Sequence, residues 1–456
     1  MKLWVKIALA AGVLLACLGA ALLGGVYWWF SEEESHWSSE SAEARTELDA
    51  GYRDFEKAYY ADAALHFERA RELDPKSAAA LVFLGITTSE SETQRADFVK
   101  QIDALDQRRF TDVERFMVRF FKAGKHQHDE LSAAVEDYLS RHPDEAFARS
   151  IRCDLLWDRK QWDDAEACYR ALLLEQPQWV QAQDRLGLLV MSRGRFAEAE
   201  DHFVTYRYVA PNQAGPHYSL GILYLLTGRY QESEAAFTQA LETKRDFCPA
   251  LSGLTHLYTV WGKYPQALET IERSEGQAAC RMLVQGGFTC SRRLFNAYLQ
   301  NDLAKALEVD AGCPLPPTGY SLGKHQLAVW QGEFPKAEAM EEAIGREAGT
   351  DPAKQAIPFL NGFWRYFRGV RLIFEDRFGE AAEEFKLAEG ELRYWTGDNA
   401  ILAFVNSVHW VYALELAGRD EEAQALRRQM TAINPQLFEN FKIPVLEAKL
   451  AARKRR

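Results

Sequence analysis

Two consecutive stretches, LGLLVMSRGRFAEAEDHF at residues 186–203 and LGILYLLTGRYQESEAAF at residues 220–237, carry one pattern 34 residues apart. In each, apolar residues recur at helical spacing on both sides of a glycine, Gly194 or Gly228. Glycine takes the left-handed backbone conformation that ends a helix at little cost. The pattern therefore predicts two antiparallel helices joined by a tight turn. Such a hairpin cannot bury its apolar faces alone and must stack on further copies.

The same marks recur at intervals of 34 residues on either side of these stretches. Small residues on both helices let the backbones approach, and an aromatic or aliphatic side chain fills the space beside the crossing. The first small position holds Cys153, Gly187, Gly221 and Thr255, the second holds Ala165, Ala199, Ser233 and Ala267, and the apolar position holds Tyr169, Phe203, Phe237 and Ile271. Looser units are marked upstream by Gly51 and Phe67 and downstream by Gly332, Gly369 and Gly418.

This arrangement resembles the tetratricopeptide repeat family. The residues that carry the resemblance are Leu186, Gly187, Gly194, Ala199, Phe203 and Pro211, then Leu220, Gly221, Tyr224, Gly228, Phe237 and Ala240. The resemblance implies an all-α, right-handed superhelical solenoid of about nine or ten antiparallel helix hairpins. It also implies a concave face, lined by the first helix of each hairpin, that binds an extended peptide or a helix of a partner protein.

The N-terminal segment predicts a membrane anchor ahead of the solenoid. Residues 7–30 contain no charged side chain, and at about 1.5 Å per residue a helix of this length spans the hydrocarbon layer. Lys2 and Lys6 precede it and Glu32–Glu34 follow it, which places the N-terminus in the cytoplasm and the rest outside. We expect a single-pass protein of a bacterial inner membrane whose repeats face the periplasm.

Two alternatives to the anchor remain open. A cleaved signal peptide would have a shorter apolar core than this one. The stretch from Leu14 to Cys17 resembles the site at which bacterial lipoproteins are acylated, here at Cys17. Either alternative still leaves residues 43–456 outside the cytoplasm.

These observations divide the chain into seven parts. They are a cytoplasmic N-terminus (1–6), a transmembrane helix (7–30), a flexible Ser/Glu-rich stalk (31–43), partly degenerate N-terminal repeats (44–145), regular repeats (146–281), divergent repeats (282–435), and a C-terminal capping helix with a basic tail (436–456).

Composition and motifs argue against several function classes. Apolar residues make up 47% and charged residues 26%, as in globular proteins. The formal net charge of −12 argues against a nucleic-acid binder, which needs a basic face. The sequence GYSLGKH at 319–325 has the wrong spacing for a phosphate-binding loop, and the common metalloprotease and hydrolase motifs do not occur. We therefore expect no enzyme activity, cofactor, metal or small-molecule substrate.

Six cysteines follow Cys17, an even number that permits disulfides outside the cytoplasm. Cys153 and Cys168 lie on the two helices of one hairpin, near their expected crossing, so they form the one pair with a geometric argument. That both are reduced core residues is an equally good interpretation. The pairing of the other four stays open.

The helical phase of the first helices selects candidate partner-binding residues on the concave face. They are Asp154, Trp157, Asp158, Asp184, Leu188, Met191, Tyr218, Ile222, Leu225, His256 and Thr259. This mixture suits a peptide with apolar anchors and some positive charge. The alternative is that several of the apolar residues pack between helices.

The preferred function is a membrane-anchored, extracytoplasmic scaffold that binds protein partners and supports the assembly or regulation of an envelope complex. One alternative is a sensory or regulatory repeat domain that relays a signal through a partner. A less favoured alternative is an enzyme with a site in residues 282–360, where the repeat marks are weakest.

Overall fold

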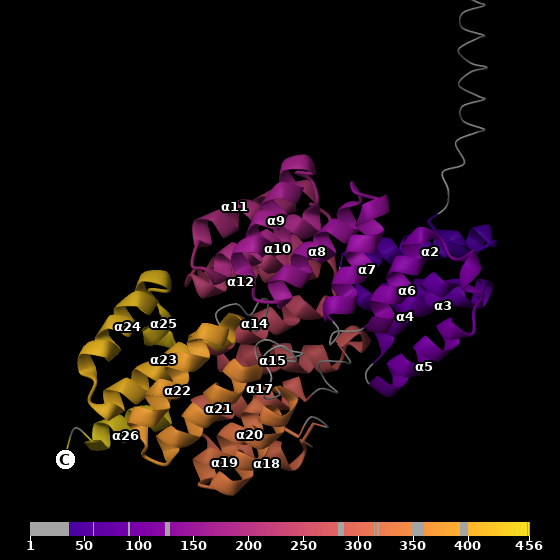
Figure 1. The fold of residues 1–456 in the computed structure, drawn as a ribbon. Helices are drawn as coiled ribbons and strands as arrows, with labels where there is room; N and C mark the ends of the chain where they lie inside the picture. Colours follow the sequence, from indigo (N-terminus) through magenta and orange to yellow (C-terminus); the bar gives the residue numbers. More distant parts are fainter. Residues whose placement is uncertain are drawn as a thin grey trace, which may run out of the picture. The chain divides into compact units, whose positions relative to one another are not determined.

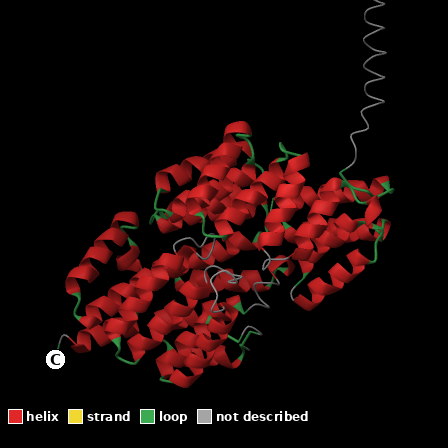
Figure 2. Ribbon diagram, in the orientation of Figure 1, coloured by secondary structure: helices red, strands yellow, loops and turns green. Residues whose placement is uncertain are grey.

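The structure, a computed structural model, describes residues 36–57, 59–89, 92–123, 128–280, 287–313, 315–316, 319–348, 360–392, 400–453 and 455. The regular structure of these residues is helical, and they contain no strand (Figure 2). They fall into two compact units. Unit 1 comprises Met1–Tyr52 and Asp62–Phe121, and unit 2 comprises Arg53–Ala61 and Lys122–Arg456.

Unit 1 contains the first repeats. Its helices are α2 (Ala42–Glu56), α3 (Tyr60–Leu73), α4 (Ala78–Thr88), α5 (Glu92–Asp103), the 3-10 helix η1 (Gln107–Arg109) and α6 (Asp112–Ala123), of which α2, α3 and α6 cross the unit boundary. A Cβ added at Gly51 would lie 2.6 Å from the ring of Phe67, so the glycine allows the close contact that the sequence predicts.

Residues 36–43, which the sequence analysis assigned to a flexible stalk, instead pack on unit 1. Trp37 is 6% exposed and donates a hydrogen bond from Nε1 to Asp49 at 2.7 Å. Its ring meets those of Tyr52 and Phe83 edge to face, each at 6.0 Å between centroids. The buried indole explains the difference, because Ser/Glu composition alone does not show that one aromatic side chain anchors the segment. The stalk prediction is therefore wrong for these residues, and residues 31–35 lie outside the described part.

Unit 2 contains the remaining hairpins (Figure 1). Its helices are α7 (His128–Arg141), α8 (Ala146–Asp158), α9 (Trp162–Glu175), α10 (Val180–Ser192), α11 (Phe196–Val209), α12 (Ala214–Leu226), α13 (Tyr230–Thr243), α14 (Cys248–Val260), α15 (Tyr264–Glu275), η2 (Ala278–Cys280), α17 (Phe288–Leu299), α18 (Leu303–Ala311), α19 (Leu322–Gln331), α20 (Phe334–Ala348), α21 (Leu360–Phe374), α22 (Phe378–Leu392), α23 (Ala400–Ala417), α24 (Asp420–Ile433), α25 (Leu437–Asn440) and α26 (Pro444–Arg453).

The close crossing of the two helices is present in the regular hairpins. A Cβ added at Gly187 would lie 2.5 Å from the ring of Phe203, and one at Gly221 would lie 2.5 Å from the ring of Phe237. Both rings are fully buried. The small residue and the aromatic side chain are therefore one packing unit, sixteen positions apart in the sequence.

One residue in each turn of unit 2's hairpins has a left-handed backbone. The residues are Lys160, Gly194, Gly228, Gly262, Asn301, Gly332, Asp376 and Gly418. Asn and Asp are the non-glycine residues that adopt this conformation most readily, whereas Lys160 is less usual. The turns place the hairpins α17–α18, α19–α20, α21–α22 and α23–α24 in the stretch 282–435. The right-handed sense of the superhelix stays a prediction.

Ion pairs repeat from hairpin to hairpin along the regular region. A cation just after each turn reaches a glutamate of the preceding hairpin, with N–O distances of 2.5 Å for Arg195–Glu166, 2.8 Å for Arg229–Glu200 and 3.7 Å for Lys263–Glu234. Both members of each successive pair advance by 34 residues. These partly exposed pairs join successive hairpins, and ion pairs of this kind add little stability.

Three disulfides join all six cysteines that follow Cys17. They are Cys153–Cys168, Cys248–Cys280 and Cys290–Cys313. The first confirms the predicted pair, and it joins α8 to α9 beside their crossing.

The structure bears on the predictions for the two ends of the chain to different extents. Among the described residues, no helix combines the length and the apolar character needed to cross a membrane. The predicted span at 7–30 lies outside those residues. At the other end, the predicted capping helix is divided into α25 and α26. Helix α26 packs on α23, where Arg453 of the predicted basic tail donates to the carbonyl of Glu415 at 2.7 Å.

Candidate functional site

The eleven predicted partner-binding residues lie on the first helices of four successive hairpins, α8, α10, α12 and α14. Six keep some exposure: Asp154, Trp157, Asp158, Asp184, Tyr218 and His256. The other five are buried: Leu188, Met191, Ile222, Leu225 and Thr259. The prediction that these five contact a partner is wrong for this conformation, because a buried side chain offers a partner no surface. The four apolar residues pack in the core, as the alternative interpretation proposed, and the hydroxyl of Thr259 donates to the carbonyl of Thr255 at 2.7 Å.

Asp154 of α8 belongs to a polar cluster that joins the first two regular hairpins. The hydroxyl of Tyr169 donates to Asp154, and Arg185 Nε lies 3.5 Å from Asp154 Oδ1. Burial and the charge of Asp154 raise the pKa of Tyr169 well above its ordinary value. Because Arg185 faces Asp154, this part of the surface is less acidic than the sequence suggests.

Two further predicted residues are partly buried titratable groups. Asp184 accepts a hydrogen bond from Ser219 Oγ at 2.6 Å, and burial raises its pKa although that bond offsets part of the effect. Burial also lowers the pKa of His256 well below its ordinary value, and the charge of Arg292 adds to this. The histidine is therefore neutral at pH 7, and its buried Nδ1 has no hydrogen-bond partner.

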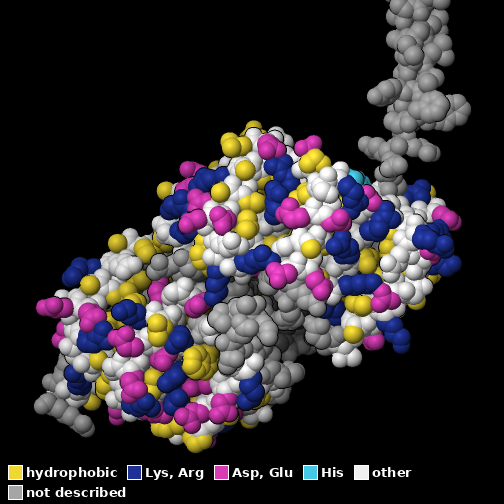
Figure 3. Space-filling view, viewed as in Figure 1, with side chains coloured by type: hydrophobic (Ala, Val, Ile, Leu, Met, Phe, Trp, Pro, Cys, Tyr) yellow, Lys and Arg dark blue, Asp and Glu magenta, His cyan; other side chains and the backbone are white. Residues whose placement is uncertain are grey.

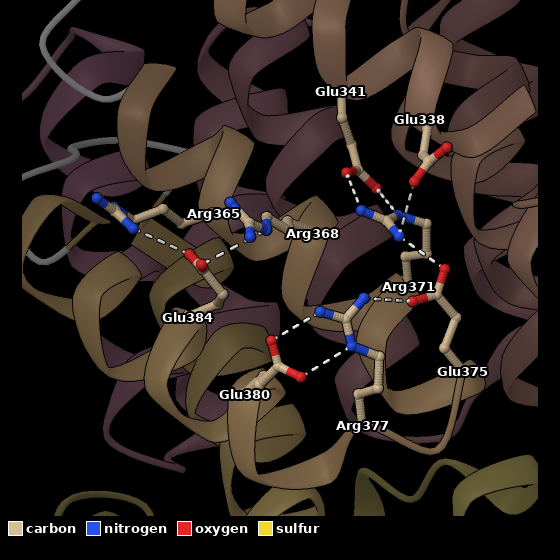
Figure 4. A network of polar contacts seen from close by, with 9 residues as sticks. All are labelled: Glu338, Glu341, Arg365, Arg368, Arg371, Glu375, Arg377, Glu380 and Glu384. Carbon is tan, nitrogen blue, oxygen red and sulfur yellow. Dashed lines mark hydrogen bonds and ion pairs between the residues drawn. The ribbon is translucent and has the colours of Figure 1, made fainter. Parts of the chain in front are cut away.

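A second cluster lies between the hairpins α19–α20 and α21–α22, and we call it the charged centre: His325, Glu338, Glu341, Arg371 and Glu375 (Figure 4, which omits His325). Arg371 is 7% exposed and binds Glu341 through two parallel bonds, Nε–Oε1 at 2.9 Å and Nη2–Oε2 at 3.0 Å. Its Nη1 reaches Glu375 at 2.7 Å and Glu338 at 3.1 Å. Three carboxylates thus surround one buried cation.

The position of the charged centre in the repeat is unusual. His325 and Glu341 are sixteen residues apart and hydrogen-bonded, Nε2 to Oε1, at 3.0 Å. This is the spacing of Gly187 and Phe203, so a polar pair stands where other hairpins have a glycine and an aromatic ring. A buried charge network in place of an apolar crossing is costly unless every member is paired.

The pKa values of the pair follow from burial and from each other. Burial lowers the pKa of His325, and the bond to Glu341 offsets only part of this. Burial raises the pKa of Glu341, but the bonds from His325 and Arg371 outweigh it and the net shift is downward. Neutral His325 must therefore donate from Nε2, which leaves its buried Nδ1 without a partner.

The other three arginines of Figure 4 are more exposed than Arg371. Arg365 and Arg368 share Glu384, at 2.9 and 3.5 Å, and both lie beside the ring of Trp364. Arg377 bridges Glu375 and Glu380. In the described part of the chain, no group of three or more His, Cys, Asp or Glu side chains is placed to hold a metal ion. The ion pairs of Figure 4 join neighbouring hairpins and balance buried charge. None of the residues drawn there is placed as a nucleophile.

Sequence reasoning did not find the charged centre. The turn at Gly332 was recognised, and counting seven residues back and nine forward from it leads to His325 and Glu341. The sequence therefore did contain a signal for the charged centre. Two polar residues occupy the positions at which the regular hairpins have a small residue and an aromatic residue.

The outer surface carries both signs of charge. On the face drawn in Figure 3, basic and acidic side chains alternate and do not gather in one basic area. The lack of a basic area on this face agrees with the formal net charge of −12.

Comparison with solved structures finds helical-repeat proteins. One is PilW, a widely conserved type IV pilus biogenesis factor, with 18% identity over 51% of this chain and 97% of that chain, at a TM-score of 0.39. Another is a tetratricopeptide repeat protein from Parabacteroides merdae, with 13% identity over 65% and 98% of the two chains and a TM-score of 0.39. The Cut9–Hcn1 hetero-tetramer of APC/C gives 15% identity over 90% and 75%, at a TM-score of 0.48.

Neither a family model nor a curated protein matches the sequence. The chain is built of tetratricopeptide-like helical hairpins, as the glycine–aromatic crossings and left-handed turns described above show.

Proposed function

We propose that this chain is a membrane-anchored, extracytoplasmic scaffold that binds a partner protein on the inner side of its hairpins and supports the assembly or regulation of an envelope complex. The observation that carries the proposal is the pairing of all six cysteines after Cys17 in three disulfides. Disulfides persist in oxidising compartments and are rare in the cytosol. The apolar segment at 7–30 supplies the anchor in this proposal.

The binding surface of the proposal is the exposed inner side of α8 with its neighbours. Trp157 offers an aromatic anchor, its ring 6.2 Å from that of Trp162, and Asp154 and Asp158 offer carboxylates next to it. Aromatic anchors surrounded by polar groups are typical of protein-binding surfaces. A partner segment with an apolar residue and a neighbouring cation fits this chemistry. The role is one of binding, and we assign no reaction to it.

Photo-crosslinking in native membranes tests the proposal. A crosslinking amino acid at Asp158, on the inner helix α8, is compared with one at Leu174, which is 86% exposed on the outer helix α9 of the same hairpin. We expect an adduct of defined mass from position 158 and none from position 174. Mass spectrometry that identifies an envelope protein supports the scaffold, whereas a kinase or transcription regulator supports the signalling alternative. Equal adducts from both positions would overturn the inner-face assignment.

A further inference from the structure

A groove of about 480 Å³ lies between the second helices of two successive hairpins, α13 and α15, over the intervening helix α14. Its floor is apolar, because Leu241 of α13 and Leu254 of α14 lie there with 5% and 6% exposure, and Tyr258 follows one helical turn further along α14. The hydroxyl of Tyr258 donates to Glu234 at 2.7 Å and is thus already bonded. The volume is that of a ligand-binding site, and the proposed function assigns no role to this groove.

Four charged side chains line this groove, in two pairs of like sign. The arginine pair is Arg245, just after the end of α13, and Arg273 of α15, whose Nη2 lies 3.3 Å from the carbonyl oxygen of Arg245. The glutamate pair is Glu242 of α13, three residues before Arg245, and Glu269 of α15, four residues before Arg273. Three or four residues make one helical turn, so the two pairs lie about 5.4 Å apart along the groove.

These four charges are not neutralised by ion pairs. In the part of the chain that the structure describes, none of the four side chains forms an ion pair, and all four are exposed. The bond from Arg273 to the Arg245 carbonyl uses only one of the five N–H donors of its guanidinium group. Like charges on the two walls of a groove repel each other, so the arginine pair favours an anionic ligand group and the glutamate pair favours a cationic one.

The two charged pairs distinguish this joint from the preceding one. The positions 34 residues earlier, on α11 and α13, hold Tyr208, Pro211, Ala235 and Gln239, and none of these carries a charge at pH 7. The helices around those positions form the same kind of hairpin. Stacking of hairpins therefore does not require the charges, and the groove between α13 and α15 owes them to another role.

We propose that this groove binds the C-terminal lysine of a polypeptide, with the terminal carboxylate at the arginine pair and the side-chain ammonium at the glutamate pair. The four-carbon stem of lysine spans roughly one helical turn, which is the separation of the two pairs. The stem packs on Leu241 and Leu254, as the apolar parts of long charged side chains do. Guanidinium groups bind a carboxylate through charge-assisted hydrogen bonds.

The arginine pair also selects a peptide end over free lysine. In free lysine an α-ammonium group stands next to the carboxylate, and two guanidinium groups repel it. In a peptide the same nitrogen is part of a neutral amide. The ligand is therefore a polypeptide that ends in lysine, and the site is separate from the surface on α8.

Fluorescence anisotropy with the purified full-length protein tests the site. The probe is a short Gly/Ala peptide that is labelled at its N-terminus and ends in lysine with a free carboxylate. Two matched peptides carry a terminal amide in place of the carboxylate, or a terminal glutamine in place of the lysine. We expect each replacement to weaken binding roughly tenfold or more, because each removes one charged group. Failure of the lysine probe to bind, or equal binding of all three peptides, would overturn the proposal.

A pair of protein variants tests the position of the site. Arg245→Gln/Arg273→Gln should weaken binding of the lysine probe roughly tenfold or more. The control is Arg207→Gln/Arg428→Gln, which changes the net charge equally at two exposed arginines that do not line the groove, and it should bind as the wild type does. Thermal unfolding confirms that both variants are folded. An equal loss of affinity in both variants would refute the site, because binding would then follow the overall charge.

Reversal of the glutamate pair gives a result that a loss of structure cannot produce. Glu242→Lys/Glu269→Lys should change the preference from the peptide that ends in lysine to one that ends in glutamate. A retained preference for lysine would contradict the role of the glutamate pair. Free lysine should displace the probe roughly tenfold more weakly than the unlabelled peptide does, and equal displacement would overturn the choice of a peptide end. The crosslinking result at position 158 concerns α8 and does not affect these outcomes.

Discussion

Phe237 shows how little space the crossing of two helices leaves. Its ring lies against Gly221 of its own hairpin and against Gly253 of the next, and a Cβ at either position would overlap it. The ring is fully buried, so it cannot move into solvent. One side chain therefore sets the distance between two successive hairpins.

Gly221→Ala should destabilise the protein by about 1–3 kcal/mol, the usual cost of overpacking a filled core. The matched control is Gly390→Ala in α22, where an added Cβ meets nothing within 4 Å. There the substitution should stabilise by about 0.5–1 kcal/mol, because alanine favours the helix. Urea unfolding of both variants measures the difference. If Gly390→Ala loses as much stability as Gly221→Ala, the close crossing of the helices is not the cause of the loss.

His409 predicts an acid-sensitive core. It is fully buried, with its Nδ1 2.9 Å from the carbonyl oxygen of Val405 and its ring 5.4 Å from that of Tyr366. Burial lowers its pKa to about 4. Below pH 6.5 this histidine binds a proton in the unfolded chain but not in the folded chain. The contribution of His409 to stability is therefore present above that pH and is lost as the pH falls toward 4.

The loss due to His409 between pH 6.5 and pH 4 should be roughly 3 kcal/mol, from about 1.4 kcal/mol per unit of pKa. His409→Gln, which does not titrate, should lose correspondingly less over the same range. Urea unfolding at pH 7 and pH 5 measures the two slopes. Identical pH dependence in wild type and variant would contradict the assignment to His409.

At the scale of elements, the charged centre joins the hairpin α19–α20, whose crossing holds the polar pair His325–Glu341, to the hairpin α21–α22, in which Gly369 meets the ring of Phe385. Arg371→Leu leaves the buried carboxylate of Glu341 without its main partner, and such a loss costs about 3–5 kcal/mol. Arg365→Leu on the same helix is the control, because Arg365 is half-exposed and Glu384 keeps Arg368. Thermal unfolding should show a large drop for the first variant and a small one for the second. Similar drops in the unfolding temperature of both variants would mean that the ion pairs of the charged centre contribute no more to stability than ion pairs on the surface.

The hairpins of residues 146–281 could be predicted because small or fairly small residues recur at their crossings at constant spacing and glycine marks three of their four turns. Asn301 makes the same left-handed turn without glycine, and no sequence mark identified the hairpin that it closes, whereas Gly369 marked the hairpin that is closed by Asp376. Helical phase selected the candidate residues of α8, but it cannot show that Leu188 or Ile222 is covered. Burial of that kind depends on how the solenoid curves, a property of packing between distant hairpins.

At the scale of the molecule, contacts over long sequence distances close unit 2 on itself. Lys160 in the turn after α8 pairs with Glu391 of α22 at 2.6 Å, and Gln436 donates to the carbonyl of Gly228 in the turn after α12 at 2.8 Å. Phe441 packs on Phe295 of α17, with 6.3 Å between the ring centroids. Polar and apolar contacts between distant hairpins therefore add to the crossings that hold each hairpin together.

The proposed function requires that the hairpin scaffold matures and works outside the cytoplasm. The most direct test is to trap thiols by alkylation in intact native cells, before lysis, and to map Cys153, Cys168, Cys248, Cys280, Cys290 and Cys313 by mass spectrometry. The account predicts that none of the six is alkylated until a reductant is added, and that the three pairs are those of the structure. Alkylation of these cysteines without reductant would contradict it.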